Sequence, residues 1–253
     1  MRPMYYFAVR NTKEILRDLQ SIIFGVGFPL VLLFLLSIIN RSIPAEAEMQ
    51  LFHLPTLLPG IMVFGLSFLA LFSATLISKD RTTSFIMRLY VSPLRSRDYI
   101  FGYMLPLLPM AVAQLLVCFV VAVFMGLPFS ANGFLCILVC LPMAVIYIAL
   151  GMICGCLFSE KAVGGVCGAL LTNLSAWLSG TWFSLDLVGG AFKKIAYYLP
   201  FANGVDAGRS ALAGDYGAIM KNLWVTLSWA AGLLLIGVLV FSAKRKSGDL
   251  SGK

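Results

Sequence analysis

Long apolar runs dominate this chain, and they limit what it can fold into. Six stretches exceed the ~18 residues that suggest a membrane span. They lie at residues 21–39, 57–77, 100–126, 134–158, 162–183 and 222–243. Because hydrocarbon offers no hydrogen bonds, each backbone N–H and C=O must be satisfied within its own segment, which favours helices. We therefore predict an all-α polytopic membrane protein with six transmembrane helices, forming a single transmembrane domain over residues 1–253.

The net charge of +8 is distributed unevenly over this predicted topology. If the N-terminus lies inside, six spans return the C-terminus to the same side. The inner segments then hold Arg2, Arg10, Lys13, Arg17, Lys79, Arg81, Arg88, Arg95, Arg97, Lys161, Lys244, Arg245, Lys246 and Lys253. The outer segments hold only Arg41, Lys193, Lys194, Arg209 and Lys221. This positive-inside bias predicts that both termini are cytoplasmic. A basic inner face also matches anionic membrane lipids, so the charge calls for no nucleic-acid partner.

Three polar or interrupted segments accompany the predicted spans. The first, residues 4–20, has an apolar stripe at helical spacing and predicts an amphipathic helix along the inner surface. Residues 78–99 form the longest inner segment and predict a short helix that ends at Ser92-Pro93. Residues 184–221 predict two short re-entrant or interfacial helices on the outer side. The stripe in the first segment consists of Tyr5, Val9, Thr12, Leu16 and Leu19.

Small residues recur at helix-packing distance in two predicted spans. Gly151 and Gly155 are four residues apart in the fourth span, and Gly164 and Gly168 repeat this spacing in the fifth. Glycine at this spacing lets two helices approach closely, which predicts tight packing of both spans. The six cysteines also lie within predicted spans, and no two of them form a CxxC pair. We therefore interpret them as small apolar residues.

The chemistry of an enzyme or of an ion-driven pump is missing from the sequence. It contains no Gly-x-x-x-x-Gly-Lys-Ser/Thr nucleotide loop and only one histidine, His53. Carriers driven by protons or sodium ions place Asp, Glu, His or Arg at membrane depth, and the predicted spans hold none there. We therefore predict a non-catalytic chain without a metal or cofactor, whose transport is either passive or driven by a separate protein.

The order of these segments resembles the permeases of type-2 ABC exporters. The resemblance rests on six spans, an amphipathic helix before the first, a long inner loop after the second and an outer helical insertion before the last. Within the inner loop, Asp80-Arg81 stands where the family has an acidic residue, and Arg88-Leu89-Tyr90-Val91-Ser92-Pro93-Leu94 matches the end of its pattern. Ser84 departs from it, because the family often has Gly there. Tyr198-Leu199-Pro200-Phe201 looks like its outer signature.

The resemblance implies partners and roles. Residues 81–92 would form a coupling helix seated on an ABC ATPase, and residues 5–19 a connecting helix beside it. The ATPase would bind the ATP and Mg²⁺, and a second permease, identical or related, would complete the complex. The first, second and fifth spans would line the route in a bacterial plasma membrane. The implied coupling residues are Asp80, Arg81, Phe85, Arg88, Leu89, Ser92 and Pro93.

Aromatic and polar residues in those three spans are our candidates for contact with the substrate. A few polar groups among aromatic rings suit an amphipathic or lipophilic compound such as a drug, peptide or lipid-like molecule. The candidates are Phe24, Phe28, Phe64, Phe68, Asn173, Trp177 and Thr181. Two other functions stay open at this point: a passive channel or carrier, and a membrane scaffold or sensor that binds a cytosolic partner.

Overall fold

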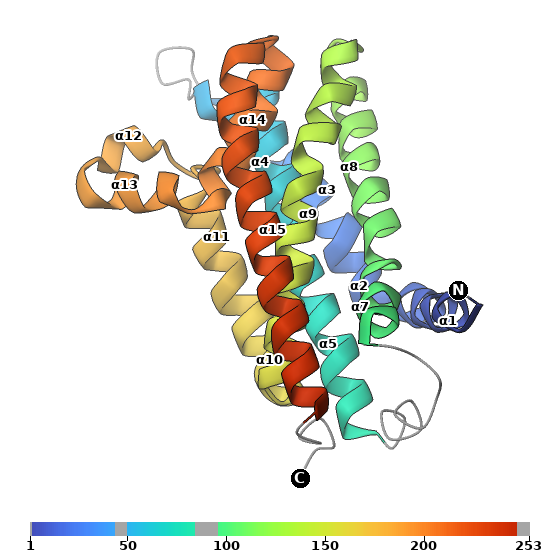
Figure 1. Ribbon diagram of the computed structural model, residues 1–253. Coiled ribbons are helices and arrows are strands. Elements are labelled where there is room, and N and C mark those ends of the chain that lie inside the picture. The colour runs from blue at the N-terminus through green and yellow to red at the C-terminus, as the bar shows by residue number, and fades with distance from the viewer. Residues whose placement is uncertain (1, 44–49, 84–95, 247–253) are drawn as a thin grey trace.

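The computed structural model describes residues 2–43, 50–83 and 96–246, and Figure 1 shows them as a bundle of long helices without strands in these ranges. The longer helices are α1 (Arg2–Arg17), α3 (Phe28–Ser42), α4 (Leu54–Leu66), α5 (Phe68–Thr82), α7 (Ser96–Met104), α8 (Leu107–Phe124), α9 (Ala131–Leu157), α13 (Gly190–Tyr198), α14 (Pro200–Ala213) and α15 (Tyr216–Lys246). The shorter pieces are α2 (Leu19–Ile22), η1 (Ile23–Gly27), η3 (Gln50–Phe52), α10 (Glu160–Val163), η4 (Gly164–Leu171), α11 (Thr172–Leu178) and α12 (Leu185–Val188).

Five helices in the described ranges are long and apolar enough to cross a membrane. They are Leu19–Ser42, Leu54–Thr82, Asp98–Phe124, Ala131–Leu157 and Tyr216–Lys244. We refer to them as spans 1, 2, 3, 4 and 6, because each covers one predicted run. Span 2 is the central one, with 89% of its apolar window buried, against 17% for span 6.

The remaining predicted span, residues 162–183, is helical over residues 160–178 but is not among those five. We call residues 160–178 segment 5. This segment ends at residue 178, five residues before the predicted end at residue 183. The reason is that Gly180 takes a positive φ of 67°, a backbone conformation in which a helix cannot continue. The prediction of an all-helical fold is confirmed, whereas the count of six spans stays a prediction.

Three interruptions of regular α-helix fall in spans 1 and 2 and in segment 5. Span 1 winds as π-helix over Ile23–Gly27, just before Pro29, whose missing N–H leaves a carbonyl of the preceding turn without its helical partner. Segment 5 is π-helical over Gly164–Leu171. In span 2 the helix breaks at Ser67, whose hydroxyl donates to the Phe64 carbonyl at 2.6 Å. Such irregularities are frequent at functional sites.

The glycines of span 4 bring its backbone against α5. A Cβ atom at Gly151 would lie 2.3 Å from the carbonyl oxygen of Ala70, and one at Gly155 would lie 2.8 Å from that of Ala74. The close approach predicted from the first glycine pair is therefore confirmed. For the second pair, Gly168 faces the side chain of Leu71 and Gly164 faces open space.

Helices also run across the bundle at two levels. In Figure 1, α1 projects sideways from the lower half of the bundle, and α12 and α13 project sideways from its upper half. We call the lower end, which carries α1, the last turn of α5 and the last turn of α15, the basic end. The outer insertion contains three helices where the sequence predicted two, because α14 turns back to pack against α4, α9 and α15.

The amphipathic helix α1 is confirmed, but its buried face differs from the predicted stripe. Phe7, Asn11 and Ile15 are buried against the bundle, whereas Tyr5 and Leu16 are 63% and 65% exposed. The helix therefore has two apolar faces, and the predicted stripe belongs largely to the outward one. An outward apolar face suits a helix that lies in the membrane interface.

Replacing Gly151 with Ala should destabilise the bundle. The added methyl group meets backbone atoms of α5, which cannot turn away, so we expect the free energy of unfolding to fall by about 1–3 kcal/mol. Gly232→Ala in α15 is the matched control, because a Cβ there meets open space. Thermal unfolding of both variants in detergent measures the difference. Equal losses in the two variants would contradict the close contact.

Candidate functional site

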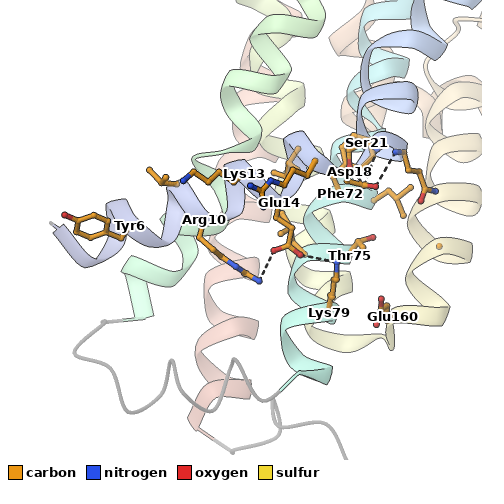
Figure 2. A pocket seen from close by; sticks show the side chains of 17 residues that line it. Tyr6, Arg10, Lys13, Glu14, Asp18, Ser21, Phe72, Thr75, Lys79 and Glu160 are labelled. Carbon is orange, nitrogen blue, oxygen red and sulfur yellow. Dashed lines mark hydrogen bonds and ion pairs between the residues drawn. The ribbon is translucent and has the colours of Figure 1, made fainter.

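A groove of about 1030 Å³ opens at the basic end, between α1, α5 and the start of segment 5. Figure 2 shows α1 crossing above the last turns of α5, with Glu14 reaching from α1 toward Lys79. The α1 wall is charged and includes Lys13, Glu14 and Arg17, while the α5 wall contributes Leu71, Phe72 and Leu76. This volume is that of a drug-sized ligand site, and its two walls suit an amphipathic molecule.

Asp80 is the centre of a buried polar network beside the groove. Its side chain is 2% exposed and accepts hydrogen bonds from Nη1 and Nη2 of Arg10 at 2.7 and 2.8 Å, and from the Tyr103 hydroxyl at 2.9 Å. A carboxylate in this position is costly unless it is paired and fully hydrogen-bonded, and here it is. The bidentate geometry is the strong form of an arginine–carboxylate pair.

The network continues on both sides of Asp80. Glu14 pairs with Arg10 at 2.8 Å and with Lys79 at 3.2 Å, and Asn11 donates to the Gly102 carbonyl at 2.9 Å. Burial disfavours the charged form of Arg10, but Asp80 and Glu14 outweigh that effect and raise its pKa. Helix α1, the end of span 2 and the start of span 3 are thereby joined by charge-assisted hydrogen bonds.

Four of the predicted contact residues gather in one aromatic cluster. Phe68 lies at the centre, with its ring centroid 5.5 Å from Phe24, 5.8 Å from Phe28 and 5.7 Å from Phe64. Phe64 also meets Trp182 edge to face at 5.4 Å. These separations are typical of favourable aromatic pairs. The cluster joins spans 1 and 2 to the segment after α11, and it flanks the break at Ser67.

The other three predicted contact residues do not join this cluster. Thr181 is buried and shares a hydrogen bond of 2.6 Å with Ser179. Asn173 is exposed, and its amide donates to the Ala169 carbonyl at 2.8 Å. Trp177 is 53% exposed. An exposed amide favours protein or water rather than lipid beside it.

The predicted coupling residues fall in two groups. Asp80 and Arg81 lie in the last turn of α5, which continues beyond the predicted end of the span at residue 77. Arg81 donates to the carbonyls of Gly155 and Phe158 at 2.9 and 3.1 Å, so it ties span 2 to the end of span 4. Phe85, Arg88, Leu89, Ser92 and Pro93 lie outside the described residues.

Sequence reasoning missed Arg10, Tyr103 and Trp182. Arg10 stood among other basic residues of an amphipathic helix, and Tyr103 among the apolar residues of a span. The acidic residue after the second span was the available signal, because a carboxylate at the edge of an apolar run needs a partner. Within the described residues, no group of His, Cys, Asp and Glu could hold a metal ion.

Two comparisons with known proteins point to one kind of protein. Residues 4–213 match the family model described as ABC-2 type transporter. The chain is also 28% identical over 204 residues to ABC transporter G family member 20 of Dictyostelium discoideum. That alignment covers 77% of this chain and 28% of the Dictyostelium protein, so the chain spans well under half of that relative.

A double-mutant cycle measures the Arg10–Asp80 pair. Arg10→Met leaves a buried carboxylate without its cation, and we expect it to lower the free energy of unfolding by about 3 kcal/mol. Asp80→Leu in the same chain should recover much of that loss, because it removes the unpaired charge. Arg17→Met is the control, since Arg17 is exposed at the other end of α1. Additive losses for the two single changes would show that the pair contributes nothing.

Proposed function

The chain belongs to the ABC-2 type transporter family and is therefore an ABC transporter permease, and on this premise we propose that it is the export subunit of an ATP-driven complex. It moves an amphipathic or lipophilic compound, such as a drug, peptide or lipid-like molecule, out of the cytoplasm. A separate ABC ATPase binds ATP and Mg²⁺ and hydrolyses the ATP. The multi-pass chain resides in a bacterial plasma membrane with both termini in the cytoplasm.

One observation carries the proposal: along the chain, Asp80 stands between the groove wall on α5 and the segment that would meet the ATPase. Asp80 is near the end of α5, and the segment with Phe85, Arg88, Leu89, Ser92 and Pro93 follows it directly. A force applied to that segment reaches the last turn of α5. There Arg81 is hydrogen-bonded to span 4, and Asp80 is joined through Arg10 and Tyr103 to α1 and span 3. The groove wall on α5 therefore moves with the same element.

The route itself follows spans 1 and 2 and segment 5. The groove gives entry at the basic end, and the aromatic cluster of Phe24, Phe28, Phe64 and Phe68 offers flat apolar surfaces farther along the same spans. The outward side chains of Asn173 and Trp177 favour a second permease beside segment 5, because a polar amide there would otherwise face lipid. Thr181 follows segment 5 and packs against Gly60 of span 2.

Coupling is tested by changing the apolar residues of the inner loop. Phe85→Ala and Leu89→Ala together should weaken binding of the partner ATPase about tenfold or more, because apolar side chains buried at an interface dominate its affinity. Binding is measured by titrating purified ATPase onto the chain in nanodiscs. Phe158→Ala is the control, since Phe158 is a partly exposed ring at the same end. Unchanged affinity of the double variant, with full ATP-driven transport, would remove the coupling role from this loop.

Contact with the substrate is tested at the aromatic cluster. Phe28→Leu keeps an apolar side chain but removes a ring, so we expect a several-fold higher half-saturating concentration of a lipophilic dye, with the maximal rate of ATP hydrolysis retained. Phe134→Leu is the control, because Phe134 belongs to a separate aromatic group with Phe119 and Phe129. Dye transport is followed in liposomes that contain the complex. Flux of the same size through the chain alone, without ATP, would favour a passive carrier instead.

A further inference from the structure

Arg209 links three parts of the chain at the end of the bundle opposite to the basic end. It projects from α14, and its side chain is 22% exposed. Its Nε donates to the Thr56 carbonyl in the first turns of α4 at 3.1 Å, and its Nη2 donates to the Gly180 carbonyl after α11 at 3.0 Å. One guanidinium therefore holds span 2 and the end of segment 5 together.

The charge of Arg209 is balanced from its own helix. Nη1 donates to Asp206 at 3.3 Å, and the other carboxylate oxygen of Asp206 accepts from the Tyr197 hydroxyl at 2.9 Å. Burial lowers the pKa of Arg209, although Asp206 opposes this shift, and an arginine stays charged throughout the physiological range. The carbonyls of Thr56 and Gly180 thus receive charge-assisted hydrogen bonds.

The backbone that carries Arg209 is tightly packed. A Cβ atom at Gly208 would lie 2.7 Å from Cβ of Pro59, and one at Gly204 would lie 2.6 Å from Met143. Span 2 and the residues after α11 also touch directly, since a Cβ at Gly60 would lie 2.9 Å from Cγ2 of Thr181. Close-packed contacts of this kind leave little room for sliding.

The irregular turns of span 2 and of segment 5 lie between the Arg209 contacts and the basic end. Span 2 breaks at Ser67, between the Arg209 contact at Thr56 and the basic end. Segment 5 is π-helical over Gly164–Leu171, again between the contact at Gly180 and the basic end. The parts near the basic end therefore have an irregular turn at which to bend, and the parts near Arg209 are cross-linked.

We infer that Arg209 is a positioning residue that keeps the opposite ends of span 2 and segment 5 together as one rigid unit, while their basic ends move. The inference rests on the proposed function, because it assigns a fixed and a moving half to an ATP-driven permease. Arginine suits the role because its rigid fork presents separate N–H groups to two acceptors. The single ammonium of lysine does not reproduce that geometry.

Two spin-label pairs test the inference in nanodiscs. Pro55→Cys with Leu187→Cys reports the Arg209 end, and Thr82→Cys with Lys161→Cys reports the basic end; all four positions are exposed. We expect the first pair to give one narrow distribution of distances, and we expect this distribution to broaden when Arg209→Gln is added. Lys221→Gln, which removes an exposed charge of the same sign, should leave it narrow. If Arg209→Gln folds poorly, Arg209→Lys is measured in the same way and should also broaden the distance.

Trapping the ATPase cycle with vanadate provides a second test with the same two label pairs. With the ATPase, ATP and vanadate present, the pair at the basic end should shift while the pair at the Arg209 end keeps its distance.

Two results would overturn the inference. A narrow distance distribution for the first pair in both Arg209 variants would show that the guanidinium positions nothing. A first pair that shifts with vanadate as much as the second would show that the two elements separate. If no ATPase binds the chain, the proposed function fails, and the comparison of labelled variants without nucleotide still decides the role of Arg209.

Discussion

The buried carboxylate of Asp80 determines how the helices at the basic end of the protein are arranged. A charge with 2% of its side chain exposed must be neutralised and hydrogen-bonded at once, and only Arg10 and Tyr103 do this among the described residues. To reach it, α1 has to lie across the bundle with Arg10 turned inward and Asn11 against Gly102. The position of α1 in turn creates the groove, whose charged wall it supplies. The interfacial helix, the groove and the last turn of α5 are therefore consequences of one ion pair.

The opposite end of the bundle is organised by close packing and by a second arginine. Gly204 and Gly208 let α14 approach α9 and α4 closely, and Gly60 lets α4 approach Thr181 after α11. Arg209 then donates to the Thr56 carbonyl in the first turn of α4 and to the Gly180 carbonyl beyond the end of α11. Between the two ends, spans 1 and 2 and segment 5 depart from α-geometry while span 4 remains regular. Span 4 and α5 share a backbone contact at Gly151, so the last turns of span 2 cannot move without span 4.

Residues in a local pattern were predictable from the sequence, and contacts between distant segments were not. Apolar runs located five spans, and the small-residue spacing located the contact at Gly151 and Gly155. The four phenylalanines were chosen as candidates for a shared route, and the structure shows that they touch. Arg10 and Asp80 are 70 residues apart, and Arg209 is 153 residues from Thr56, so no periodicity could pair them. The face of α1 was misassigned because a helix with two apolar faces gives two stripes, and the sequence does not tell which one meets protein.

The π-helical stretch in segment 5 also sets which side chains look outward beyond it. A π-turn closes i→i+5 hydrogen bonds instead of i→i+4, so it accommodates an additional residue and rotates everything that follows relative to a regular helix. In segment 5 the residues that follow are Thr172–Leu178, with Thr172 and Ser175 turned inward and Asn173 and Trp177 outward. Deleting one glycine from Gly164–Leu171 and letting the winding relax to α-helix would therefore leave this face in place, whereas relaxation without the deletion would turn the face by roughly 100°. The winding of a glycine-rich stretch thus decides which chemistry this wall presents to its neighbour.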